Sequence, residues 1–343
     1  MWHKLVEPVG LLYGQMARDA VARGFARPLM DGPAAFTHVR LIEGTVTSPL
    51  MPLADVPKGW EAELHRLSAP TSHGMVPPGP QVMGILNVTP DSFSNGGQHF
   101  QAEEAIKAGL AMVEVGCGVL DIGGESTRPG SSPVTPEQEW ARVAPVLAGL
   151  RARAPQATLS IDTRHSLVMA RALSAGAAVV NDVTALRHDP AALPLLAAQN
   201  CGVVLMHMRG TPQTMERYAV YDDVACEVVR ELGQRVQVAL QAGIARERLM
   251  VDPGFGFAKT AAQNVVLLRR CLLLANLGCR VVFALSRKRM LGEMTGVARA
   301  EDRDAASMAA SLPAMAFGAP LLRVHDVPAM VQGMRVWQAI CRD

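Results

Sequence analysis

From residue 81 onward the sequence alternates short, continuously apolar runs, rich in β-branched residues, with longer stretches that have helical periodicity. Continuous apolar runs are typical of parallel strands that are buried on both faces. Eight such units in about 260 residues favour a (β/α)8 barrel over an open doubly wound sheet. No G-x-G-x-x-G string follows the first run, which also disfavours a dinucleotide-binding fold. The eight runs are residues 82–88, 119–122, 158–161, 179–181, 203–207, 249–252, 281–285 and 321–325.

The first 80 residues have a different pattern. They predict a short helix over residues 15–25, a strand over 38–46 and a second short helix over 60–67. A stretch rich in proline, glycine and serine then covers residues 68–80. We therefore expect a small N-terminal extension over residues 1–78 and a barrel over residues 79–343. A segment of this size is marginal as an independent core, so we expect the extension to be stabilised by packing against the barrel.

Composition excludes several classes of protein. The 343 residues carry 33 Lys and Arg against 31 Asp and Glu, which gives no reason to expect a nucleic-acid partner. No apolar stretch is long enough for a membrane span, and the N-terminus lacks a secretory pattern. The six cysteines show neither a CxxC pair nor metal-ligand spacing, which is typical of a reducing compartment. We expect a cytoplasmic protein without a membrane partner.

Polar residues follow every predicted strand. In a (β/α)8 barrel the carboxyl ends of the strands and the loops after them form the active site. At a single position, an Asp or Asn that caps the next helix is an equally good explanation. Similarly, His207 fits a hydrogen-bonded core histidine as well as a binding residue. Capping does not explain polar residues at all eight strand ends, so we expect a binding site there.

One group of these strand-end residues suits a flat heterocycle with several N–H and C=O groups. Asp162, Asn181, Asp252 and Lys288 supply acceptors and donors. A carboxylate that accepts two N–H bonds from a guanidine-like edge fixes the orientation of the ring. Met206 has a polarisable thioether that suits the face of such a ring.

A second group suits an anion such as phosphate. Arg128, Arg323 and His325 are cationic or hydrogen-bonding, and Arg323 and His325 point the same way along a strand because they lie two residues apart. Asn87 offers an oxygen that, together with phosphate oxygens and water, would hold Mg²⁺. A heterocycle site beside a phosphate site suggests a substrate that carries both groups.

The chain from about residue 81 to its end resembles the dihydropteroate synthase family of the folate pathway. The resemblance rests on ordered motifs in the right structural context, which is far more specific than one glycine-rich string. The motifs are MGILNVTPDSFS (83–94), DIGGESTRPG (121–130), SIDT (160–163), NDV (181–183), LMHMRGTP (205–212), DPGFGFAKT (252–260), SRK (286–288) and RVHDV (323–327).

The resemblance implies that p-aminobenzoate is joined to 6-hydroxymethyl-7,8-dihydropterin diphosphate with release of diphosphate. By this similarity the pterin would be held by Asp162, Asn181, Asp252 and Lys288, with Met206 beneath it, and the diphosphate and its Mg²⁺ by Asn87, Arg323 and His325. Asp91, Thr127 and Arg128 would lie on two loops, 91–97 and 125–130, that close over the substrates. Phe257, Lys288 and the residue after Lys288 would flank the p-aminobenzoate pocket. The family pattern also suggests a homodimer formed away from the strand carboxyl ends.

The implied chemistry fits these residue types. An arylamine is neutral at pH 7 and is nucleophilic without a strong base. The difficult step is cleavage of the carbon–oxygen bond, where preorganised positive charge stabilises the leaving diphosphate. An electron-rich dihydropterin shares the positive charge left on its methylene, which favours a dissociative, SN1-like path that Asp91 would help to stabilise. Loop closure would exclude water from the cation.

Three positions depart from the family pattern. Ala284 stands where glycine is usual beside the pterin, Asn95 replaces a common aspartate in the first loop, and Arg289 follows Lys288 where serine is frequent, so sulfonamide sensitivity does not follow from the resemblance. The extension also lies outside the family core. Ala284 and the extension leave open a non-catalytic pterin-binding paralogue. A pterin-using methyltransferase on the same barrel is a third reading, but it has no use for the anion cluster. The fold alone does not separate these readings.

Overall fold

The computed structural model describes residues 2–70, 75–89, 98–126 and 133–341, and its central feature is a closed barrel of parallel strands. The strands follow one another in chain order, and β13 pairs with β6 to close the ring. They are β6 (Gln81–Asn87), β7 (Val119–Gly123), β8 (Thr158–Asp162), β9 (Val179–Asp182), β10 (Gly202–Met206), β11 (Leu249–Asp252), β12 (Arg280–Phe283) and β13 (Leu321–Val324). The predicted (β/α)8 barrel, also called a TIM barrel, is confirmed, and each strand starts and ends within two residues of its predicted range.

The strands are buried on both faces, so the barrel has two apolar cores. Side chains inside the ring form a small cluster of their own: Val76, Met83, Val119, Val179, Val204, Met250, Val282 and Leu321. Residues on the outer faces, such as Leu120 and Val203, join a much larger core with the helices. Because apolar side chains fill the interior, a ligand reaches the barrel only at its ends.

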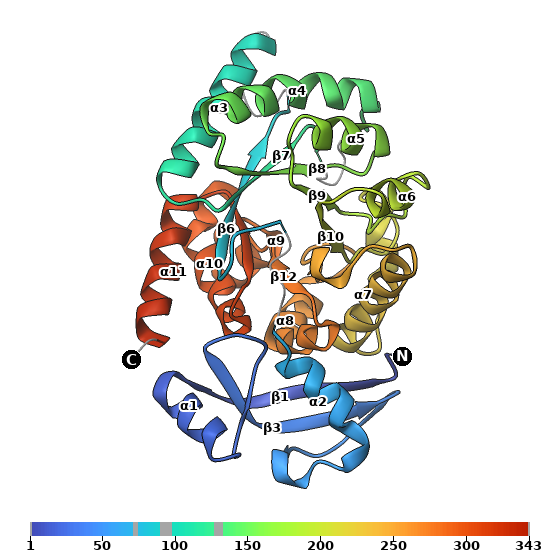
Figure 1. Cartoon of the computed structure of the whole chain (residues 1–343), viewed down its shortest axis with the longest axis vertical. Coiled ribbons are helices and arrows are strands. Elements are labelled where there is room, and N and C mark those ends of the chain that lie inside the picture. The colour runs from blue at the N-terminus through green and yellow to red at the C-terminus, as the bar shows by residue number, and fades with distance from the viewer. Residues whose placement is uncertain (1, 71–74, 90–97, 127–132, 342–343) are drawn as a thin grey trace.

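Helices surround the barrel on the outside (Figure 1). Several begin at side chains that satisfy free backbone N–H groups: Thr135 and Thr260 form capping boxes with Gln138 and Gln263. Each such cap stabilises its helix by about 1 kcal/mol. The helices are α3 (Gln98–Glu114), α4 (Pro136–Arg153), α5 (Ser166–Ser174), α6 (Ala192–Ala197), α7 (Val224–Gln241), α8 (Ala261–Arg269), α9 (Arg289–Thr295), α10 (Asp304–Ser311) and α11 (Val327–Cys341), with short 3-10 turns such as η4 (Met215–Tyr218), η6 (Cys271–Leu277) and η7 (Ala300–Arg303). None of the helices in the described parts of the chain is long and apolar enough to cross a membrane.

The N-terminal segment forms a five-stranded sheet with two helices. Its elements are β1 (Lys4–Tyr13), α1 (Gly14–Ala22), β2 (Arg27–Pro28), β3 (Ala34–Glu43), β4 (Val46–Thr47), β5 (Met51–Pro52) and α2 (Glu61–Ser68). The predicted helices and strand are confirmed as α1, α2 and β3, with shifted ends. Strand β1 is absent from the prediction, because Pro8 and Gly10 interrupt its pattern and both residues usually weaken a strand. It pairs along its length with β3 in the antiparallel sense.

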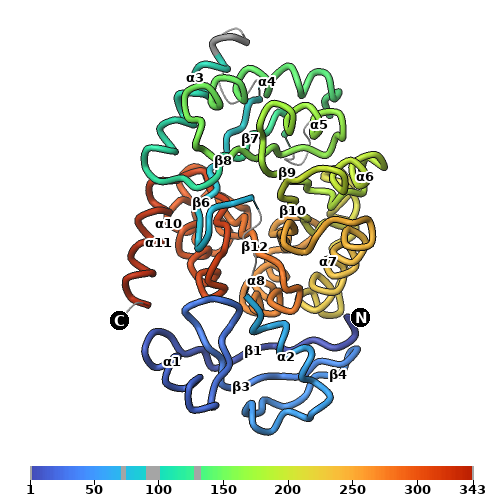
Figure 2. Tube along the Cα trace, viewed as in Figure 1, coloured from blue at the N-terminus to red at the C-terminus, as the bar shows by residue number. Residues whose placement is uncertain are grey.

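This sheet packs directly on the barrel segment that follows α8 (Figure 2). Asn276 of η6 bonds the backbone of Val6 at both ends, since its Oδ1 accepts from Val6 N (2.9 Å) and its Nδ2 donates to Val6 O (2.8 Å). Glu7, which is only 6% exposed, accepts two hydrogen bonds from Arg270. The buried side chains of β1 belong to the same apolar core as the barrel helices.

Candidate active site

A cavity of about 850 Å³ lies at the carboxyl ends of the barrel strands. It brings together six of the predicted site residues, which come from five different strands or from the loops after them: Asn87, Asp162, Phe257, Lys288, Arg323 and His325. Residues far apart in the sequence meet here because parallel strands in a barrel all end at the same rim.

The guanidinium of Arg323 bridges two carboxylates at the floor of this cavity. Its Nε donates to Asp121 Oδ2 and its Nη2 to Asp162 Oδ2, both at 2.7 Å. Asp121 is fully buried and also accepts from Ser160 Oγ (2.6 Å) and Asn181 Nδ2 (2.9 Å). Burial alone would lower the pKa of Arg323, but Asp121 and Asp162 raise it above its usual value, so the guanidinium stays charged.

The two carboxylates share one cation, and this changes how Asp162 titrates. Burial raises the pKa of Asp162 to about 7, with Arg323 opposing the shift and Asp121 adding to it. Near neutral pH, Asp162 therefore exists in both protonation states, which lets it either accept or donate a hydrogen bond to a ring.

Lys288 lies between the acidic floor and an aromatic wall. Its Nζ is 4.3 Å from the centre of the Phe257 ring, a cation–π contact. Burial lowers the pKa of Lys288 to about 8, Arg323 adds to this shift, and the nearby Asp252 and Asp162 oppose it. Lys288 is thus mostly charged at neutral pH, but it loses its proton at a lower pH than an exposed lysine does.

His325 and Arg323 both face the cavity from the end of β13, as their spacing predicts. The backbone N–H of His325 donates to Ser286 Oγ (3.1 Å), and the same hydroxyl lies 2.9 Å from His325 Nδ1. Ser286, which is buried and also lines the cavity, therefore fixes the orientation of the ring.

Asn87 ends β6 and is half-buried at the cavity wall. A Cβ on Gly123 would lie 3.7 Å from both Asn87 Oδ1 and Asp162 Oδ2, so the glycine leaves room between these two oxygens. Within the described residues, no group of three or more His, Cys, Asp or Glu side chains is placed to hold a metal ion. The residues present fit Mg²⁺ that takes few protein ligands and draws the others from phosphate and water.

Three other predicted residues lie behind the cavity wall and are not among the described residues that line it. Asn181 and Asp252 end or nearly end β9 and β11 and are 4% and 3% exposed. Burial raises the pKa of Asp252, although Lys288 and Arg323 oppose this, and its Oδ1 accepts from Gly254 N (2.7 Å). Met206 packs in a buried cluster that includes Phe257.

The predicted residues Asp91, Thr127 and Arg128 lie outside the described residues. Hydrogen bonds hold the chain at the start of the second of these loops. Glu125, which lines the cavity, accepts two hydrogen bonds from Arg164 (2.9 and 2.7 Å), and Arg142 donates to the carbonyl of Gly124 (2.8 Å).

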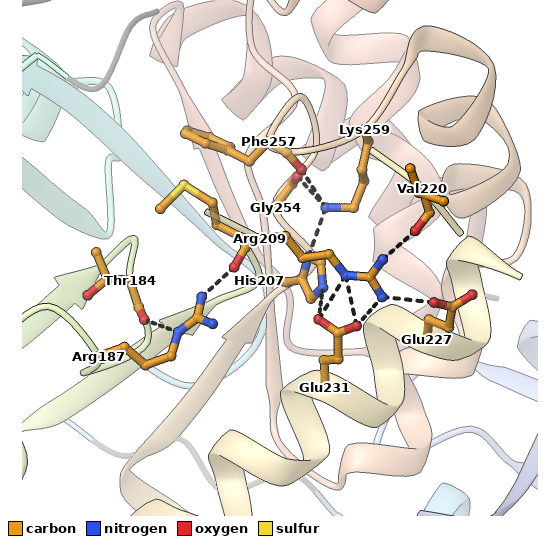
Figure 3. A network of polar contacts seen from close by, with 11 residues as sticks. Thr184, Arg187, His207, Arg209, Val220, Glu227, Glu231, Gly254, Phe257 and Lys259 are labelled. Carbon is orange, nitrogen blue, oxygen red and sulfur yellow. Dashed lines mark hydrogen bonds and ion pairs between the residues drawn. The ribbon is translucent and has the colours of Figure 1, made fainter. Parts of the chain in front are cut away.

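A second polar network, which the sequence did not reveal, supports the wall of the cavity (Figure 3). Lys259 follows Phe257 in the loop between β11 and α8, is 7% exposed, and donates to the ring of His207. His207 in turn contacts Glu231 of α7 (3.0 Å), and Arg209 binds the same carboxylate (2.9 Å). The sequence signal that could have pointed to Lys259 is the rarity of lysine. The chain has only five lysines: Lys4, Lys58, Lys107, Lys259 and Lys288. Asp121 was visible as a strand-end carboxylate, but nothing in the sequence distinguished its role from that of Asp162.

Most of the chain is similar to one family of known proteins. The family model described as pterin binding enzyme matches residues 83–325. A dihydropteroate synthase of Neisseria meningitidis serogroup C is 44% identical over 265 residues, which cover 76% of this chain and 93% of the relative. One of Escherichia coli (strain K12) is 42% identical over 260 residues, covering 76% and 91% of the two chains.

Solved structures agree with these relatives. The dihydropteroate synthase of Xanthomonas albilineans with 4-aminobenzoic acid has a TM-score of 0.71 at 50% identity, covering 76% of this chain and 93% of that one. The same enzyme in complex with 7,8-dihydropteroate has a TM-score of 0.69 at 48% identity with the same coverage. The N-terminal sheet lies before the matched family region, which begins at residue 83.

Proposed function

The chain belongs to the pterin-binding enzyme family as a dihydropteroate synthase, and from that premise we propose how its site performs the reaction. The reaction joins 6-hydroxymethyl-7,8-dihydropterin diphosphate to p-aminobenzoate and yields 7,8-dihydropteroate and diphosphate. One observation carries the assignment of roles: a single cavity joins Arg323 and His325, which suit an anion, to Asp162 and Lys288, which suit a heterocycle.

In this proposal the acidic floor binds the pterin. Asp162 and Asp252 accept N–H groups of the ring, Asn181 and Lys288 bind its polar edge, and Met206 packs beneath it. Asn181 and Asp252 lie behind the cavity wall, and Asp162 is bound to Arg323. The pterin would therefore share Asp162 with Arg323 and require a small rearrangement of the floor.

Arg323 and His325 bind the departing diphosphate together with Thr127 and Arg128 of the second loop. Asn87 would hold Mg²⁺, because its amide oxygen is a hard ligand at the cavity wall. When bound, Mg²⁺ neutralises the charge that develops on the diphosphate oxygens. The charged state of Arg323, which its two carboxylates secure, makes it a permanent part of this anion site.

The bond-breaking step needs positive charge at the leaving group and a dry environment around the methylene. Arg323 and His325 stabilise the diphosphate as the carbon–oxygen bond breaks, and the dihydropterin shares the charge left on carbon, so the path is SN1-like. We propose that Asp91, on the first loop, helps to stabilise that cation. The neutral amine of p-aminobenzoate, which binds in the pocket that Phe257 and Lys288 flank, then attacks the methylene and loses its proton to solvent or diphosphate.

The first test is diphosphate release by the purified chain with both substrates and Mg²⁺. Release that requires p-aminobenzoate, and that falls at least about 100-fold in Lys288→Ala and Arg323→Ala, supports these roles. Arg153→Ala is a matched control, because that arginine forms an exposed ion pair with Glu103 on α3. Absence of release with pterin binding still seen by calorimetry would contradict the proposal and favour a non-catalytic paralogue.

We also propose a cytoplasmic homodimer with small-molecule substrates alone as partners. All six cysteines are free thiols and five are buried, which suits a reducing compartment. We further propose that residues 1–78 are an extension of the barrel at residues 79–343, supported by the contacts of Glu7 and Val6 with η6 and its flanking residues. Sedimentation of the full chain tests the dimer.

A further inference from the structure

Lys259 is a buried cation whose Nζ, among the described residues, donates to its own loop and to one histidine. Its Nζ donates to the carbonyls of Gly254 (2.8 Å) and Phe257 (3.0 Å) and to His207 Nδ1 (3.0 Å) (Figure 3). Burial lowers the pKa of Lys259 to about 7. Two of the three partners are carbonyls that can only accept, so the arrangement is complete only when Nζ carries three hydrogens.

Glu231 determines that His207 is the third acceptor. The Glu231 carboxylate, whose pKa is lowered to about 2 because hydrogen bonds from His207 and Arg209 outweigh the effect of burial, can only accept, so His207 Nε2 carries the ring proton. Nδ1 is then left with a lone pair that faces Lys259. Burial and the charge of Lys259 lower the pKa of His207 to about 4, which keeps the ring neutral.

The loop that Lys259 holds contains the aromatic wall and adjoins the pterin-binding carboxylate. Gly254 donates its N–H to Asp252 Oδ1 (2.7 Å) while its carbonyl accepts from Lys259 and from Phe257 N (3.1 Å). A Cβ on Gly254 would lie 1.9 Å from the carbonyl oxygen of His207, so the loop fits against β10 with no space to spare. The Phe257 ring then lies against Lys288.

We propose that Lys259 is a positioning residue for p-aminobenzoate. Its ammonium fixes the two carbonyls at the ends of the Gly254–Phe257 turn. It thereby positions the Phe257 ring against Lys288 and the Gly254 N–H against Asp252. His207, oriented by Glu231, anchors this ammonium to β10. The proposal rests on the proposed function, because Phe257 and Lys288 are the residues that flank p-aminobenzoate in it.

The test compares Lys259→Met with Lys107→Met in diphosphate release. Methionine keeps most of the side-chain volume but removes the three donors, whereas Lys107 is an exposed lysine of α3 that pairs with Glu104 on the same helix. We expect Lys259→Met to raise the KM for p-aminobenzoate about tenfold while kcat falls less than about threefold, and Lys107→Met to match the unchanged chain. A lower melting temperature with an unchanged KM would overturn the proposal, since it would show a purely structural role.

A pair of milder variants covers the case in which Lys259→Met does not fold. In His207→Gln an amide oxygen accepts from Lys259 and the amide N–H₂ donates to Glu231, whereas His207→Leu provides neither. We expect the KM for p-aminobenzoate to stay within about threefold of the unchanged chain in the first and to rise about tenfold in the second. Equal behaviour of the two variants would overturn the proposal. Absence of diphosphate release from the unchanged chain would instead contradict the proposed function, so the two failures are distinguishable.

Discussion

Replacing Arg323 by methionine removes the one cation that Asp121 and Asp162 share. Methionine is of similar length and leaves no large cavity, so the change isolates the lost charge and its two hydrogen bonds of 2.7 Å. Asp121 is fully buried but keeps its bonds from Ser160 and Asn181. Asp162 loses the only hydrogen bond to its carboxylate that we find among the described residues, so most of the effect should fall on it.

The magnitude depends on pH because the pKa of Asp162 is already raised to about 7. Loss of a neighbouring opposite charge raises a carboxyl pKa by about 1–3 units. A rise of about two units lowers the free energy of unfolding at high pH by about 2–3 kcal/mol relative to the unchanged chain. A carboxyl with a raised folded-state pKa contributes stability at low pH and loses it as pH rises through that pKa. The variant therefore goes on losing stability from pH 7 to about pH 9, where the unchanged chain has stopped.

Urea unfolding at pH 6 and pH 9, followed by circular dichroism, measures this difference. We expect Arg323→Met to lower the free energy of unfolding by about 2–3 kcal/mol more at pH 9 than at pH 6. Adding the second change Asp162→Asn should remove this difference between the two pH values. Arg153→Met, which breaks an exposed ion pair, should cost less than about 1 kcal/mol at both pH values. An equal loss at both pH values, or an excess that survives Asp162→Asn, would refute the assignment of a shared cation.

Three further predictions concern pH, specificity and the extension. As pH rises, the kcat/KM for the pterin substrate should increase through about pH 7, where Asp162 ionises, and decrease through about pH 8, where Lys288 loses its proton. In an active Lys288→Arg variant the decrease at alkaline pH should be absent. Ala284 lines the cavity, and Ala284→Gly should strengthen pterin binding about fivefold by calorimetry, whereas tighter binding by the alanine form would contradict a crowded ring. Glu7→Gln should lower the free energy of unfolding by about 1–3 kcal/mol in urea, while Glu61→Gln, at an exposed pair, should leave it unchanged; equal effects would argue against a buried anchor.

Much of the barrel and its rim could be predicted from the sequence because both follow from local rules. Continuous apolar runs indicate buried parallel strands, and in a barrel such strands all place their carboxyl ends at one rim. Hence Asp162, Lys288 and Arg323 could be assigned to one site although they lie as many as 161 positions apart. Strand β1 was missed because its stability comes from pairing with β3 and packing on the barrel, neither of which a proline-interrupted pattern reveals.

The partners within the site could not be predicted because they depend on strand register and helix rotation. Gly123 lies opposite Asp162 in the β7–β8 pair, so Asp121 falls opposite Ser160 and deeper in the barrel. That offset places one carboxylate on each side of Arg323, and no spacing along the chain encodes it. Glu231 is a further example, since it lies in the middle of α7 with no strand-end signal and is linked to Lys259 through His207.

The chemistry of each cation explains why this arginine-rich chain keeps lysine at two positions of its active site. Arg323 faces two separate carboxylates, and a planar guanidinium reaches both with different N–H groups. The three acceptors of Lys259 surround one nitrogen, which suits the tetrahedral N–H groups of an ammonium and not the planar N–H groups of a guanidinium. Lys288 places a compact charge over the Phe257 ring beside a substrate site. The rarity of lysine in this chain is therefore informative, because two of the five lysines mark places where a compact point charge suits the contacts better than a planar guanidinium.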